Sequence, residues 1–145
     1  MGIRENRIKE FILPKRIVKA EGNIHNLEKL LTGFEKQNFF KIDKPFTIKG
    51  KGYIILDFGR EIYGTLRLMI NKFFDEKAGN NFRIRFGESL TEACAEIGEK
   101  GATNDHATRD MEIYMSPNSD VEWGNTGFRF VRIDFLLNQT YIINK

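Results

Sequence analysis

The sequence is poor in cysteine, histidine and tryptophan, and it has no long apolar run. Its one cysteine, Cys94, excludes an internal disulfide and any multi-cysteine zinc site. No stretch approaches the about 20 apolar residues that a membrane-spanning helix needs, and the N-terminus does not follow the secretory pattern. As the sequence stands, we expect a cytoplasmic protein with no membrane partner, or a periplasmic or secreted one if a signal lies upstream.

Motifs of common catalytic and cofactor sites are also missing. The chain contains no Walker A and no G-x-G-x-x-G element for phosphates or dinucleotides. None of its serines occupies a G-x-S-x-G nucleophile elbow. We therefore expect neither a cofactor nor a catalytic residue within these 145 residues.

Phenylalanine, in contrast, is abundant, with 13 residues, and alternation of apolar and polar side chains dominates the second half of the chain. Such a period of two indicates strands that have one face on a core and one in water. The clearest strand segments are residues 53–58, 65–70, 82–86, 111–115 and 128–135. Turn-forming residues separate these segments at short intervals, which predicts an all-β fold, an antiparallel β-sandwich.

The length suits one domain with a single core. We place residues 1–145 in one β-sandwich domain whose main strands lie in residues 51–137. Residues 1–50 form a basic lead-in that has more Lys and Arg than Asp and Glu. Because charges of both signs are interspersed there, we interpret the lead-in as a solvated surface and not as a polyanion-binding patch.

Residues 87–108 interrupt the alternation and predict one long loop with a short helix near residues 90–97. Long ordered loops often carry function. This one runs into a dense polar cluster that contains Asp105, His106, Arg109 and Asp110. The cluster is either a working site or a polar connection between two strands.

A metal site in this cluster lacks the ligand spacing of an EF-hand, and the only other histidine, His25, lies far away in sequence. We therefore expect no metal. A glycosidase uses two carboxylates on either side of a sugar, and Asp105 and Asp110 qualify by residue type alone. That signal is weak, because acids are common in any sequence.

The polar-connection interpretation makes a structural prediction around Arg129. Arg129 lies two and four positions before Val131 and Ile133, so its side chain is expected to lie on the same, core-facing side of the strand. A buried guanidinium needs a carboxylate partner, because an unpaired buried charge is very costly. Asp110 and Glu88 each lie at the end of an alternating strand, and we expect one of them to pair with Arg129.

Residues 126–133, TGFRFVRI, are similar to the RNP1 strand of RNA-recognition motifs. The match is partial, since Thr126 replaces the basic residue, Arg129 replaces Gly or Ala, and Ile133 replaces the last aromatic. That fold also needs a helix and a further strand after RNP1, and the 12 residues from Asp134 are too few for both. We therefore expect no nucleic-acid partner.

Three stretches together resemble a known family. They are YIILDFGREIYGTLRL, FRIRFGESLTEACAEIGEKGATNDHATRD and VEWGNTGFRFVRIDF. One strand ends in Asp57-Phe58-Gly59 and is followed by Gly64, a second ends in Gly87-Glu88, and a closing strand carries Gly127-Phe128-Arg129-Phe130. Their order and spacing, from about residue 14 to residue 135, resemble the non-catalytic β-sandwich region of bacterial α-L-rhamnosidases of glycoside hydrolase family 78.

The resemblance implies a jelly-roll or concanavalin-like domain. In such enzymes, acidic residues of a downstream helical (α/α) barrel hydrolyse the substrate with inversion. The barrel is expected to begin after Asp134, whereas the sequence ends at Lys145, so no catalytic residue is carried over. Asp105, His106 and Arg109 fall in the family's loop, where they order it or line a surface that faces a sugar or the barrel.

From this resemblance we expect an accessory domain of an α-L-rhamnosidase-like glycoside hydrolase, a fragment or truncated product whose partner is the missing barrel. The alternative is a free-standing carbohydrate-binding module for rhamnose-containing glycans. Such a module stacks a sugar on an exposed aromatic side chain, for which Trp123, Tyr63 and Tyr114 are candidates, although each also suits core or edge packing. An independent hydrolase would need a carboxylate pair that the sequence does not identify.

Overall fold

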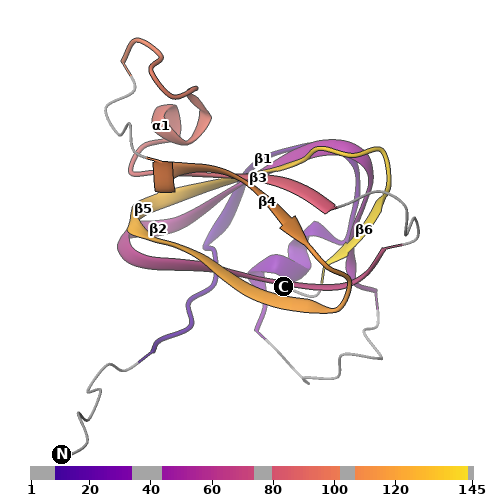
Figure 1. The fold of residues 1–145 in the computed structure, drawn as a ribbon. Helices are drawn as coiled ribbons and strands as arrows, with labels where there is room; N and C mark the ends of the chain where they lie inside the picture. Colours follow the sequence, from indigo (N-terminus) through magenta and orange to yellow (C-terminus); the bar gives the residue numbers. More distant parts are fainter. Residues whose placement is uncertain (1–8, 34–43, 74–79, 102–106, 144–145) are drawn as a thin grey trace, which may run out of the picture.

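The computed structural model describes residues 9–33, 44–73, 80–101 and 107–143. Within these ranges the chain is mostly antiparallel β-structure, as the alternation predicts (Figure 1). The strands are β1 (Arg16–His25), β2 (Phe46–Phe73), β3 (Asn80–Gly87), β4 (Asp110–Met115), β5 (Ser119–Phe135) and β6 (Thr140–Ile143). The helical elements are short: the 3-10 helices η1 (Leu27–Leu31) and η2 (Ala107–Arg109), and the α-helix α1 (Leu90–Cys94).

The strands form one continuous sheet in the order β1-β2-β5-β3-β4. The long strands β2 and β5 curve from one layer into the other, so the sheet folds over its own core (Figure 1). Strand β6 pairs with both ends of β2, because Ile143 lies opposite Phe46 and opposite Ile70. The result is the all-β sandwich that the sequence predicts.

The core lies between the two layers and is rich in phenylalanine. Phe82, Ile84 and Phe86 of β3 are fully buried and lie opposite apolar residues of β5. The rings of Phe82, Phe135 and Tyr141 meet edge to face, with centroids 5.1–5.5 Å apart. Burial of one such side chain contributes about 1.5–3 kcal/mol, so these rings supply a large part of the folding free energy.

The pairing of β2 with β5 contains one large irregularity. Asp57 lies opposite Phe130 and Ile62 lies opposite Phe128, so four residues of β2 bulge out across from Arg129. Gly59 within this bulge adopts a positive φ of 81°, which residues with a side chain rarely take. The bulge brings the carboxylate of Asp57 and the guanidinium of Arg129 to the same side of the sheet.

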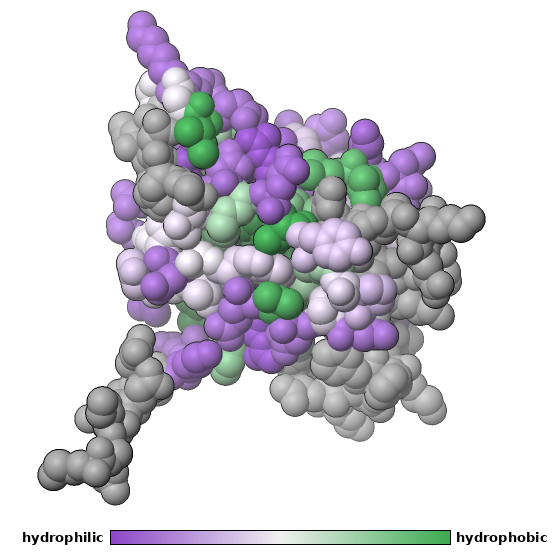
Figure 2. Space-filling model, in the orientation of Figure 1, coloured by the Kyte–Doolittle hydropathy of each residue, from purple (hydrophilic) through white to green (hydrophobic). Residues whose placement is uncertain are grey.

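The long connection between β3 and β4 contains α1 and η2, and α1 begins and ends within the expected helix. Helix α1 lies at the end of the sandwich away from β6 (Figure 1). Apolar atoms on the face drawn in Figure 2 form small groups between hydrophilic ones. None of the helices among the described residues has the length and apolar character to cross a membrane.

Candidate functional site

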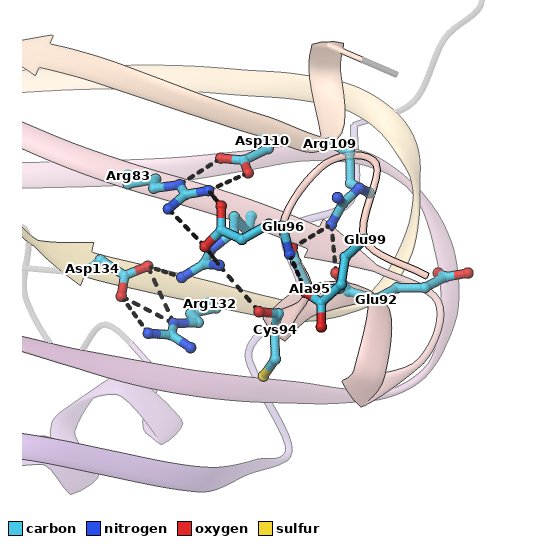
Figure 3. A network of polar contacts seen from close by, with 11 residues as sticks. Arg83, Glu92, Cys94, Ala95, Glu96, Glu99, Arg109, Asp110, Arg132 and Asp134 are labelled. Carbon is cyan, nitrogen blue, oxygen red and sulfur yellow. Dashed lines mark hydrogen bonds and ion pairs between the residues drawn. The ribbon is translucent and has the colours of Figure 1, made fainter. Parts of the chain in front are cut away.

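The connection between β3 and β4 covers a network of charged side chains on the outer face of the sheet (Figure 3). Because Phe82, Ile84 and Phe86 point into the core, the alternating Arg83 and Arg85 point outward. Register then sets their neighbours. Arg83 lies opposite Asp134 of β5, and Arg85 lies opposite Asp110 of β4 and Arg132 of β5.

Arg83 pairs with two carboxylates in this network. Its Nε and Nη2 donate to the two carboxylate oxygens of Asp110 at 2.8 and 2.6 Å, and its guanidinium also pairs with Glu96 from the loop. The hydrogen bonds to Asp110 and then those to Glu96 raise the pKa of Arg83. In turn, Arg83 lowers the pKa of Glu96, so both partners stay charged at neutral pH.

Arg85 connects the loop to the sheet from a buried position. Its Nη1 donates to the carbonyl oxygen of Cys94 at 3.1 Å, and its Nη2 donates to Asp134 at 3.0 Å. Asp134 also accepts from Arg132, with Nη2 to Oδ1 at 2.7 Å. A guanidinium has five donors in a fixed fork, which lets one buried side chain bind a carbonyl and a carboxylate together.

Arg109, a predicted ligand-binding residue, is completely buried. Its Nη1 donates to the carbonyl oxygens of Glu92 at 2.5 Å and Ala95 at 3.3 Å. These carbonyls belong to the last turn of α1, where backbone oxygens lack partners within the helix. Arg109 therefore holds the end of α1 from inside the loop, which favours the polar-connection interpretation.

The predicted partner of Arg129 is wrong. Its guanidinium binds Asp57, with Nε to Oδ1 at 2.8 Å and Nη2 to Oδ2 at 3.1 Å, whereas Asp110 binds Arg83. The expected position of Arg129 on the core face is also wrong, since its side chain is 38% exposed. Phe128 and Val131 both join the core although three residues apart, so the alternation shifts by one residue between them and turns Arg129 outward.

Asp57 is the carboxylate that the bulge of β2 buries, with a side chain only 2% exposed. It accepts from Arg129, from Arg16 Nε at 2.8 Å and from the backbone N–H of Gly59 at 2.7 Å. The hydrogen bonds from Arg129, together with those from Gly59 and Arg16, hold the pKa of Asp57 far below its usual range, although burial alone raises it. Asp57 is therefore a fixed negative charge in a structural role.

Glu88, the other predicted partner of Arg129, lies at the start of the loop instead. Its backbone N–H donates to Oε2 of Glu92 at 2.9 Å, while the side chain of Ser89 accepts from the backbone N–H of Glu92 at 3.2 Å. These reciprocal bonds cap the N-terminus of α1 much as a capping box does. The spacing of Ser89 and Glu92 is a sequence signal that predicts this cap.

The aromatic candidates for sugar stacking differ in exposure. Trp123 is partly buried, packs against the core and lies opposite Leu66. Tyr63 and Tyr114 are 75% and 67% exposed.

Asp105 and His106 lie outside the described residues. In the part of the chain that the structure describes, no three His, Cys, Asp or Glu side chains gather as metal ligands would.

Two clusters contain charged residues that the sequence analysis did not single out as a site: Arg16 and Asp57 at the bulge of β2, and Arg83, Arg85, Arg132 and Asp134 under the loop between β3 and β4. The outward position of the two arginines of β3 follows from the alternation. Their partners follow only from the register of strands that are distant in sequence, which the alternation does not fix.

The fold has a counterpart among solved structures. No family model matches the chain, and no curated protein matches it. A solved structure of a rhamnosidase from Klebsiella oxytoca with rhamnose bound is similar over 92% of this chain, with a TM-score of 0.56 and 14% sequence identity. The similarity covers 28% of that rhamnosidase chain. At this identity the comparison shows a shared fold, and it places that fold within a part of a much longer rhamnosidase.

Proposed function

We propose that this chain is the accessory β-sandwich domain of an α-L-rhamnosidase-like glycoside hydrolase of family 78, and that it packs against and positions a catalytic (α/α) barrel. The observation that carries the proposal is the similarity of nearly the whole chain to 28% of a rhamnosidase chain. The three resembling stretches of sequence point to the same family, and their strands β2, β3 and β5 are adjacent in the sheet.

The pKa values and the arginine partners of the carboxylates favour a role without catalysis. A glycosidase needs one carboxyl group with a raised pKa to act as the acid. Asp57 and Glu96 have lowered pKa values, and Asp110 and Asp134 are bound to arginines. These four acids therefore serve as partners of arginines, and we assign proton transfer to the barrel.

The loop between β3 and β4 is the surface that we assign to contact with the barrel or its sugar. Arg85 and Arg109 fix its backbone through the carbonyl oxygens of Cys94, Glu92 and Ala95. These fixed carbonyls give the segment 92–95 a constant shape, which suits a surface that positions another domain. We also propose Asp105 and His106, which lie outside the described residues, as ligand-binding residues.

The experiment begins with the coding sequence that follows the Lys145 codon. We expect a region that encodes a long helical barrel, in phase or after a frameshift. The barrel should then be produced alone and joined to this chain, and the hydrolysis of p-nitrophenyl α-L-rhamnopyranoside and the Tm of each product compared. The joined protein should be more stable and more active. A stop codon followed by an unrelated gene, or equal stability and activity of both products, would contradict the proposal.

A free-standing carbohydrate-binding module is the second candidate, and the exposure of Tyr63 and Tyr114 favours it. Titration of the labelled chain with L-rhamnose separates the two functions. A module should show saturable chemical-shift changes at an exposed tyrosine, at Trp123 or in the loop. An accessory domain should show none at millimolar sugar.

A further inference from the structure

A cavity of about 490 Å³ lies between residues 9–14 and the sandwich. We call residues 9–14 the strap. Core side chains of both layers line the cavity, among them Phe46, Leu56, Leu66 and Phe128. Ordinary cores contain few voids larger than a water molecule, whereas small-molecule pockets measure roughly 300–1,000 Å³. The cavity therefore has the size of a ligand site.

The strap covers this cavity without being part of the sheet. Where it joins β1, the backbone N–H of Lys15 donates to the carbonyl oxygen of Asp57 at 2.8 Å. Toward its other end, the ring of Phe11 lies 5.1 Å from the guanidinium of Arg67, and this ring is 65% exposed. Between these points Ile12 packs on the core. A short extended segment held in this way can move aside without breaking any strand pairing.

The charged residues at the cavity differ in whether they have partners. Arg67 is held by Asp120 at 2.7 Å, and Lys9 lies 3.5 Å from Glu122. Arg60 lines the cavity and is exposed, and no hydrogen bond or ion pair joins it to another described residue. Glu10 also lines the cavity, and its negative charge disfavours a ligand that carries more than one negative charge. Arg60 is thus the cation that remains available to a single anionic group.

We propose that the cavity binds a single-chain amphiphile with one negative charge, of the fatty-acid type. The alkyl chain lies on the apolar walls, and the carboxylate lies at Arg60. The proposal is independent of the role in a rhamnosidase and adds a second ligand chemistry to the domain.

The length of the alkyl chain gives the first test. Octanoate, decanoate and dodecanoate, each below its micelle concentration, should be titrated into the whole chain by calorimetry. Burial of each additional methylene should tighten binding about three- to fourfold until the cavity is full, with one ligand per chain. Absence of saturable binding, or a stoichiometry well above one, would overturn the proposal.

The head group gives the second test. Arg60→Gln should weaken dodecanoate binding about fivefold and leave binding of the uncharged 1-dodecanol unchanged, because only the carboxylate pairs with the guanidinium. Lys51→Gln is the matched control, since it removes one exposed charge of β2 outside the cavity. Equal losses in the two variants, or no loss in Arg60→Gln, would overturn the assignment of Arg60.

The position of the ligand gives the third test, and it needs no variant. Methyl groups of Ile54 and Ile143 line the cavity, whereas Ile113 of β4 does not. Intermolecular nuclear Overhauser effects from dodecanoate to the first two methyl groups are expected. Effects at Ile113 without any at Ile54 or Ile143 would show that the amphiphile binds elsewhere, and would overturn the site.

Discussion

The molecule contains two clusters of arginine and carboxylate that differ in which of their charges are buried. At the bulge of β2 the carboxylate of Asp57 is buried, and its partners Arg16 and Arg129 are 64% and 38% exposed. Under the loop between β3 and β4 an arginine is buried, with Arg85 4% exposed, and of its two carboxylate partners Asp134 is 13% and Glu96 is 62% exposed. One cluster thus buries only the acceptor, whereas the other buries a donor together with one of its acceptors.

The backbone around each cluster explains the difference. A carboxylate only accepts hydrogen bonds, and the bulge offers it the free N–H of Gly59. A guanidinium only donates, and the end of α1 offers the carbonyl oxygens of Cys94, Glu92 and Ala95. Each irregular segment of backbone therefore supplies the groups that the buried charge beside it needs, an N–H donor for Asp57 and carbonyl acceptors for Arg85 and Arg109.

The largest expected effect is on the buried acceptor. Asp57→Ala leaves Gly59, Arg16 and Arg129 without their acceptor, and loss of one member of a buried ion pair costs about 3–5 kcal/mol. Denaturant unfolding should show that the free energy of unfolding falls by about 3 kcal/mol. Asp120→Ala is the control, since that carboxylate is 31% exposed in its pair with Arg67 and should cost less than about 1 kcal/mol. Equal losses would contradict the comparison.

The buried donor comes next. Arg109→Met keeps much of the side-chain volume but removes the two hydrogen bonds to the carbonyl oxygens of Glu92 and Ala95, so the end of α1 should loosen. Hydrogen exchange should become faster at the amides of Ala93 and Ala95, which bond within α1. Arg16→Met should leave both amides unchanged. Protection that survives in Arg109→Met would show that the guanidinium does not hold the helix.

Acid should weaken the cluster around Asp57. The pKa of Asp57 is depressed in the folded state, so its contribution is complete above the unfolded pKa of about 3.9 and is lost as pH falls toward the folded pKa. The stability difference between the wild type and Asp57→Asn should therefore be constant near neutral pH and shrink below about pH 4. A difference that grows on acidification would show that the sign of the shift is wrong.

Arg129→Met should have a smaller effect than loss of Asp57, because Arg16 and Gly59 still bind the carboxylate. The Tm should fall at neutral pH, and the part of the acid-induced loss of stability that Asp57 causes should become smaller and be complete at a higher pH, since Arg129 is the main cause of the lowered pKa of Asp57. Both are measured in one series of thermal melts at different pH values. A Tm that stays within error of the wild type would refute the pairing.

The smallest effect is expected for Glu96→Gln. Arg83 lowers the pKa of Glu96, but the Glu96 side chain is 62% exposed and water screens the pair. In the variant Arg83 still pairs with Asp110. The free energy of unfolding should change by no more than about 0.5 kcal/mol. A loss similar to that of Asp57→Ala would mean that the exposed members of a cluster matter as much as the buried ones.

The alternation of side chains predicted the strands and the phenylalanine core because a period of two reports directly on a half-buried sheet. It also placed Arg83 and Arg85 on the outer face. It failed at Arg129, where a bulge shifts the parity, and bulges leave no clear mark in the spacing of apolar residues. Partners such as Asp57 and Arg129 are separated by 72 positions, so only the register of the folded sheet brings them together.

The position of β6 between the two ends of β2 has a consequence for synthesis. Both ends of β2 leave the ribosome long before residues 140–143, and their edges next to β6 stay open until β6 arrives. Open strand edges pair readily with other chains. The nascent protein is therefore most exposed to aggregation in the interval before β6 emerges, and a chaperone that shields β2 during that interval would improve the yield of folded protein.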